Sequence, residues 1–242
     1  MTEKDTLEST KLSLQNTDTM SDVKHNPVVS SLLSLLKGIP LCGDLIDNSI
    51  ESLLKHFQTQ KQKELLNIIE SSAGTITSDM VNDVEFIMSY LKTGNAIAKL
   101  LNADKVKFYG NLLVNGYLSE QEKISADEFE EYLELLNSLS YRELEYLVLF
   151  KEFSSKHNGR LVYQNWTAFR MEFQNKFPNR NINSAFKRLQ RTGFINEVIE
   201  TGTVDEGALS LDINSIGFEA EPEFFRFNEM VLKTFNENQA NS

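Results

Sequence analysis

The stretch "NRNINSAFKRLQRTGFI", Asn179 to Ile195, has the pattern of a short helix with one buried face. At about 100° per residue, four apolar side chains share a narrow arc that is expected to pack inward. The arc consists of Ile182, Ala185, Phe186 and Leu189. Gly193 stands where a left-handed C-cap is expected, and Phe194 and Ile195 return to the core. The polar residues outside the arc form the outer face of this helix.

The segments around this stretch predict a small α+β unit. Ser140 and Glu143 form a capping-box pattern that predicts a helix ending near Ser155. We expect a short strand in "RLVY" (160–163), a helix capped by Asn165 and ended by Pro178, and then the opening stretch. The remaining expectations are strands in "FINEVIETG" (194–202) and "GALSLDIN" (207–214), an extended "FFRF" (224–227), and a last helix with Phe227, Met230, Val231 and Phe235.

This order of elements resembles a winged-helix domain over about residues 140–235. The resemblance lies in element order and periodicity, without a diagnostic motif. It implies that residues 181–192 take the place of the recognition helix, which lies in the major groove in DNA-binding members. The following hairpin would be the wing.

The preceding residues predict a helical bundle. Residues 1–26 are polar and aperiodic, which is typical of a disordered arm. Apolar residues at helical spacing predict helices over about 43–71 and 79–101, another after Asn102, and one that starts at Ser125 with Glu128 in capping-box spacing. The predicted fold class is therefore mainly α, a helical bundle followed by a small winged-helix-like α+β domain. The predicted domains are a disordered arm (1–26), the helical bundle (27–138), the winged-helix-like domain (139–237) and a disordered tail (238–242).

Charge is distributed unevenly along the chain. The 242 residues have a formal net charge of -11, which argues against general adhesion to nucleic acid or to a membrane surface. Residues 151–196, however, contain nine Lys or Arg and only two acidic residues. Residues 119–146 and 197–229 each contain nine acidic residues. Such blocks of like charge usually mark surfaces with different partners.

The outer face of the 182–192 helix is the predicted nucleic-acid contact. Its side chains are of the types that bind phosphates or base edges. The candidate residues are Arg180, Asn183, Ser184, Lys187, Arg188 and Arg191. The predicted wing, "ETGTVDEGA", contains Glu200, Asp205 and Glu206, which phosphates would repel. Two interpretations therefore stay open: contact with DNA, and contact with a protein partner or another copy of the chain.

The sequence favours a non-enzymatic, cytoplasmic protein without a cofactor. Its single cysteine, Cys42, cannot form an intramolecular disulfide, and a reducing compartment is the default expectation. His25, His56 and His157 lack the spacing of metal ligands. No glycine-rich phosphate loop is present. Neither a signal-peptide-like start nor an apolar run of membrane-spanning length is found, so no stable membrane span is expected.

A second function is suggested by the apolar segment "VVSSLLSLLKGIPLCGDLIDNSI" (28–50). It resembles the Gly-Ile-Pro-broken segments at the start of helical bundles in abortive-infection alpha-type phage-defence proteins of bacteria. The resemblance implies an effector that acts through its bundle on a partner or a membrane, with Leu32, Leu35 and Leu36 in contact. The alternative is a helix buried in the core of the bundle. The first hypothesis remains a DNA-binding or regulatory protein whose bundle mediates self-association or partner binding.

Overall fold

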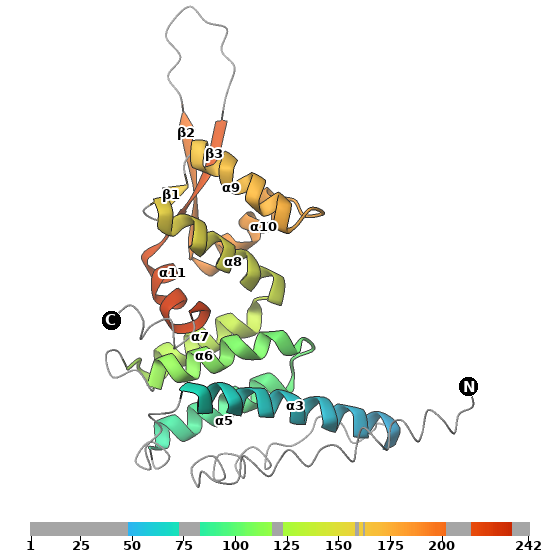
Figure 1. Cartoon of the computed structure of the whole chain (residues 1–242). Coiled ribbons are helices and arrows are strands. Elements are labelled where there is room, and N and C mark those ends of the chain that lie inside the picture. The colour runs from blue at the N-terminus through green and yellow to red at the C-terminus, as the bar shows by residue number, and fades with distance from the viewer. Residues whose placement is uncertain are drawn as a thin grey trace, which may run out of the picture. The chain divides into compact units, whose positions relative to one another are not determined.

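The computed structural model is mainly helical, with a small antiparallel sheet toward its C-terminal end (Figure 1). It describes residues 48–72, 83–117, 123–157, 160–161, 163–201 and 214–233. The chain divides into two compact units between Ala98 and Lys99. The sequence placed its domain boundary later, after residue 138, where the predicted winged-helix-like order of elements begins.

In the described part of the first unit, two helices pack against each other, α3 (Asn48–Ser72) and α5 (Val84–Ala98). Both correspond to helices predicted from apolar spacing, to within one residue at the end of α3. Their buried side chains include Leu65, Leu66, Ile69, Phe86, Tyr90 and Ile97. Lys61 is also buried, and its Nζ donates to the Ala98 carbonyl at 3.1 Å, which satisfies a terminal carbonyl of α5. Leu32, Leu35, Leu36 and Cys42 lie outside the described residues.

The second unit begins with a 3₁₀ turn, η2 (Ala103–Lys105), followed by α6 (Val106–Tyr117) and α7 (Ala126–Ser138). The predicted cap at Ser125 is confirmed, since its hydroxyl accepts from the Glu128 amide at 3.2 Å. All residues of α6 except Lys107 are buried, and the helix packs on α7 and on a C-terminal π-helix, η5 (Asn228–Leu232). That packing explains why α6 and α7 belong to the same unit as the C-terminal elements.

The sheet is associated with three helices, and the order of these helices and the strands along the chain matches the sequence prediction. Figure 1 shows α8, α9 and α10 together beside the strands. The elements are α8 (Tyr141–Ser154), η3 (Ser155–His157), β1 (Arg160–Leu161), α9 (Tyr163–Lys176), α10 (Ile182–Leu189), η4 (Gln190–Thr192), β2 (Ile195–Thr201) and β3 (Asn214–Ala220). The strand order is β1-β3-β2, and both pairings are antiparallel, with Arg160 opposite Glu219 and Ile195 opposite Ala220.

Three local predictions were wrong. Asn165 does not cap α9, because the helix already begins at Tyr163. The partner of β2 is Asn214–Ala220 rather than 207–214, since this later segment places Phe218 in the core beside Trp166. The "FFRF" segment is not extended: it forms α11 (Pro222–Phe227), where Pro222 occupies the first helical position and Phe224 and Phe227 are both buried.

Aromatic rings fill the core of the C-terminal elements. Phe186 of α10 lies 5.4 Å from Phe150 of α8, 5.4 Å from Phe169 of α9 and 5.2 Å from Phe218 of β3, measured between ring centroids. All four rings are fully buried. Tilted and edge-to-face pairs at these separations add stability beyond the burial of area. One side chain of α10 is therefore in contact with α8, α9 and β3, which fixes the helix on this core.

Within the described ranges, the helices lack either the length or the apolar character needed to cross a membrane.

Candidate nucleic-acid interface

Helix α10 begins at a well-formed N-cap. Asn181 has extended backbone angles, and its side-chain oxygen accepts from the Ser184 amide at 3.0 Å. The inward arc predicted from the sequence is confirmed, because all four of its members are buried. Those residues are Ile182, Ala185, Phe186 and Leu189. The opposite face of α10 is therefore the one directed to solvent.

The end of α10 is also fixed by local geometry. The helix tightens into η4 and stops at Gly193, whose φ of 74° is the left-handed conformation expected of a C-cap glycine. The Thr192 hydroxyl donates to the Leu189 carbonyl at 2.6 Å and accepts from the Phe194 amide at 3.2 Å. Phe194 and Ile195 then enter the core, as predicted. The sequence pattern thus indicated the residue that ends the helix, Gly193, but it did not identify Asn181 as the N-cap.

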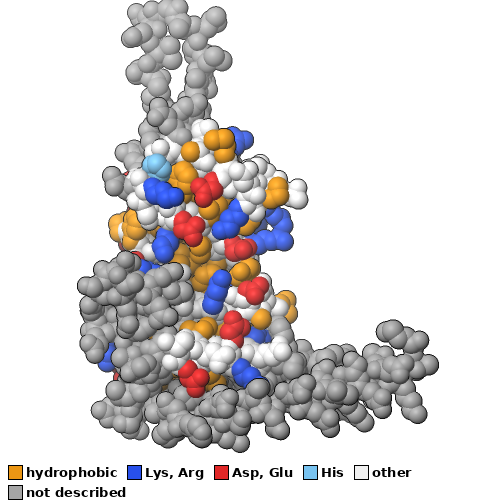
Figure 2. Space-filling view, viewed as in Figure 1, with side chains coloured by type: hydrophobic (Ala, Val, Ile, Leu, Met, Phe, Trp, Pro, Cys, Tyr) orange, Lys and Arg blue, Asp and Glu red, His pale blue; other side chains and the backbone are white. Residues whose placement is uncertain are grey.

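Five of the six predicted contact residues form one exposed surface, here called the α10 face. The α10 face consists of Arg180, Asn183, Ser184, Lys187 and Arg188. Figure 2 shows Lys and Arg side chains gathered at the edge of the molecule where the turn between α9 and α10 lies. Among the described residues, Lys187 approaches one carboxylate, with its Nζ 3.9 Å from Glu197 of β2, and its side chain remains 58% exposed. An exposed pair at this distance contributes little, so Lys187 is available to another anion.

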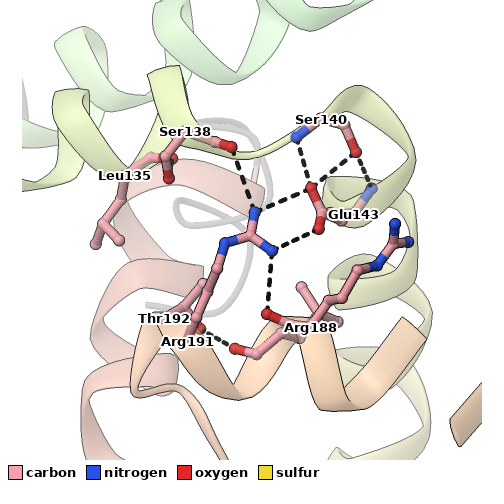
Figure 3. Close-up of polar contacts among 8 residues, drawn as sticks. Leu135, Ser138, Ser140, Glu143, Arg188, Arg191 and Thr192 are labelled. Carbon is pink, nitrogen blue, oxygen red and sulfur yellow. Dashed lines mark hydrogen bonds and ion pairs between the residues drawn. The ribbon is translucent and has the colours of Figure 1, made fainter. Parts of the chain in front are cut away.

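The sixth predicted residue, Arg191, has a different environment (Figure 3). Its Nη1 donates to Glu143 Oε1 at 2.8 Å and to the Arg188 carbonyl at 3.0 Å. Its Nη2 donates to Glu143 Oε2 at 3.2 Å and to the Ser138 carbonyl at 3.3 Å. The structure therefore separates Arg191 from the α10 face, although its side chain is 45% exposed.

Glu143 is the acceptor that holds Arg191. It completes the capping box of α8, because its Oε2 accepts from the Ser140 amide at 2.8 Å and from the Ser140 hydroxyl at 2.9 Å. Its side chain is only 6% exposed. Burial alone would raise the pKa of Glu143, but the hydrogen bonds from Arg191 and Ser140 outweigh that effect and lower the pKa to about 2.

The sequence pattern did not identify Glu143 as a partner of Arg191. It indicated the capping box from the spacing of Ser140 and Glu143, and it placed Arg191 on the polar side of its helix. The two residues are 48 positions apart, and nothing in local periodicity relates them. Only the packing of α10 against the α7–α8 junction brings them together.

Other predicted features lie partly beyond what the structure describes. Glu200 belongs to β2, but its side chain is not described, and Asp205 and Glu206 fall outside the described residues. The acidic wing therefore stays a sequence prediction. His157 packs against Phe153, with ring centroids 5.0 Å apart. Among the described residues, no group of three or more His, Cys, Asp or Glu side chains is placed to hold a metal ion.

The α10 face combines two kinds of chemistry that suit a nucleic acid. Arginine and lysine bind phosphate oxygens, and asparagine and serine side chains bind phosphates or base edges. Four of these side chains project from one helix with both ends capped, and Arg180 lies in the turn just before it. Comparison of the chain with models of protein families, with curated proteins and with solved structures finds no significant match.

Proposed function

We propose that this protein is a non-enzymatic, DNA-binding regulatory protein that uses the α10 face to contact duplex DNA. The observation on which the proposal rests is the division of α10 into a buried apolar side and an exposed side with two cations, next to a third cation in the preceding turn. The cations are Arg180, Lys187 and Arg188. A helix presented in this way can enter a major groove while its cations lie beside the phosphates.

The arrangement of the C-terminal elements supports a winged-helix domain as the scaffold of that contact. Its helices and strands follow the order α8, β1, α9, α10, β2, β3, and the sheet order is β1-β3-β2. In a winged helix, the second helix of the helix-turn-helix is the recognition helix. Here α9 and α10 would be that pair, and β2 and β3 would be the strands of the wing.

Salt dependence of binding is the test of the proposal. Fluorescence anisotropy with a labelled duplex of mixed sequence would give the dissociation constant over a series of salt concentrations. A Lys187→Ala/Arg188→Ala variant should bind more weakly, and the slope of log K against log salt should fall by about 0.9 for each phosphate contact removed.

A matched variant provides the control. Lys99→Ala/Lys123→Ala removes the same charge from two exposed lysines of the second unit that are not on α10. It should leave both affinity and slope close to those of the wild type. Equal losses in the two variants would show that only net charge matters, and no binding by the wild type at low salt would refute the DNA proposal.

The alternative function, a phage-defence effector that acts on a partner or membrane, remains a hypothesis about Leu32, Leu35 and Leu36. It predicts liposome leakage or partner capture that depends on these leucines and persists in the Lys187→Ala/Arg188→Ala variant. If the wild type shows no affinity for DNA, this experiment is the next one to perform.

A further inference from the structure

Arg191 has no terminal hydrogen left for an external ligand. Each terminal nitrogen of a guanidinium group has two hydrogens. Both hydrogens of Nη1 are used by Glu143 and the Arg188 carbonyl, and both hydrogens of Nη2 are used by Glu143 and the Ser138 carbonyl. Judged by exposure alone, Arg191 would be grouped with Lys187 and Arg188 as a possible ligand contact. Its hydrogen bonds to acceptors within the protein indicate a different role.

The acceptors of Arg191 belong to three different helices. Ser138 is the last residue of α7, Glu143 lies in the first turn of α8, and Arg188 lies in the last turn of α10. The Ser138 carbonyl stands at the C-terminus of α7, where carbonyls have no partner within their own helix, and the Arg188 carbonyl also accepts from the amide of Gln190. The guanidinium of Arg191 therefore joins the end of α10 to the junction between α7 and α8 (Figure 3).

Glu143 is a rigid anchor for this junction. Its carboxylate is held by the amide and hydroxyl of Ser140 as well as by Arg191, and the neighbouring Leu144 and Leu147 of α8 are fully buried. A bidentate Arg–carboxylate pair fixes both distance and orientation, which a single point charge cannot do. The rotation of α10 about its own axis, and with it the direction of Lys187 and Arg188, is thereby tied to α8.

We propose that Arg191 and Glu143 form a positioning pair that orients the α10 face for its contact with DNA, and that Arg191 itself does not contact the DNA. This inference rests on the proposed function of the α10 face. It differs from the simplest expectation for a basic recognition helix, in which every exposed arginine is a phosphate or base contact.

The Glu143→Gln variant distinguishes the two roles by the sign of its effect. If Arg191 contacted phosphate, removal of the competing carboxylate would release it and reduce local negative charge, so DNA affinity would rise. If the pair positions α10, affinity falls by roughly 2- to 30-fold, the range typical of changes that alter coupling between packed elements. The measurement is anisotropy at fixed salt with the same labelled duplex.

Arg191→Lys and Arg191→Ala provide the second comparison. Lysine retains the charge but cannot reproduce the bidentate pair with Glu143. A positioning role predicts that both variants lose affinity while the salt slope stays at the wild-type value. A phosphate contact predicts that Arg191→Lys keeps its affinity and that Arg191→Ala lowers the slope by about 0.9.

If Glu143 and Arg191 only stabilised the fold, a folded variant would not lose DNA affinity while keeping the wild-type salt slope. Circular dichroism melts would establish that each variant is folded at the binding temperature. Hydrogen exchange would then show faster exchange at residues 188–193 in Glu143→Gln and Arg191→Ala, whether or not DNA is present. Unchanged exchange there, or wild-type affinity in both Glu143→Gln and Arg191→Lys, would overturn the positioning role. Failure of the wild type to bind DNA would instead overturn the proposed function.

Discussion

Asn115 of α6 donates from its Nδ2 to the carbonyl of Met230 and to the carbonyl of Lys233, each at 3.1 Å. The same amide lies 3.1 Å from the Glu229 carbonyl, and Asn111 one turn earlier donates to the Val231 carbonyl at 3.1 Å. Two amides on α6 therefore hold the carbonyls of the π-helix that ends the described chain. The last carbonyls of a helix have no donor within the helix, and α6 supplies the donors here.

Substitution of Asn115 should destabilise the second unit. Asn115→Ala leaves buried carbonyls without a donor, at a cost of about 1–3 kcal/mol, and Asn115→Asp should cost more because it places a carboxylate among carbonyl oxygens. Urea denaturation would measure both. Asn175→Asp, at an exposed position of α9, is the matched control and should leave the unfolding free energy close to wild type. Equal effects at the two positions would contradict this account of α6.

Gly193 should tolerate asparagine better than alanine. Its φ of 74° is strained for residues with a Cβ, although nothing lies within 4 Å of the position that a Cβ would occupy. We therefore expect Gly193→Ala to lower the unfolding free energy by about 1 kcal/mol, and Gly193→Asn by less. Thermal melts of the two variants would provide the comparison. A loss in Gly193→Asn as large as that in Gly193→Ala would show that backbone strain is not the cause.

The sequence predicted the features that depend on local periodicity and local capping. The buried arc of α10, the cap residues Ser125 and Ser140, and the left-handed Gly193 all follow from residues close to one another in the chain. The mainly helical class follows from the same patterns.

Features that depend on tertiary contacts were not predictable in this way. The "FFRF" segment has high strand propensity, yet it is helical because Phe224 and Phe227 both enter the aromatic core from one side of a helix. The polar outer face of α10 was predicted, but neither its exposure nor the separation of Arg191 from it was. That separation depends on Glu143, which lies on another helix.

Because of Lys105, the free energy of unfolding should increase with pH in mildly alkaline solution. Lys105 is buried, donates to the Leu136 carbonyl, and desolvation lowers its pKa to about 8, with Glu143 opposing that shift. Because the folded pKa lies below the unfolded value, the folded state binds fewer protons between about pH 8 and pH 10, so stability increases with pH in that range.

The Lys105→Met variant tests this origin. Between pH 7.5 and 9.5, the unfolding free energy of Lys105→Met should rise less than that of the wild type, because the variant lacks this lysine. The window follows from the shifted and the ordinary lysine pKa values. Lys123→Met, at an exposed site, should retain the wild-type profile. Parallel profiles for the wild type and Lys105→Met would show that burial does not depress the pKa of Lys105.

Protonation of Glu143 should account for part of the stability that the second unit loses at acid pH. Its pKa of about 2 lies below the ordinary value of 4.5. A carboxyl group with a depressed folded pKa stabilises the protein fully above the unfolded pKa, and this stabilisation is lost as pH falls from about 4.5 toward 2. The side chain is 6% exposed, so solvent screening is small, and the shift corresponds to about 3 kcal/mol at neutral pH.

Glu143→Gln should therefore be less stable than the wild type at pH 7, and the difference should shrink as pH falls below about 4.5. Urea denaturation at intervals between pH 2.5 and 7 would follow the difference between the two proteins, in which the titration of all other carboxyl groups cancels. Glu134→Gln, at an exposed position of α7, serves as the control and should leave the unfolding free energy close to that of the wild type. A difference between Glu143→Gln and the wild type that stays constant from pH 7 to pH 3 would mean that the Glu143 carboxylate is not held in its charged form by Arg191 and Ser140.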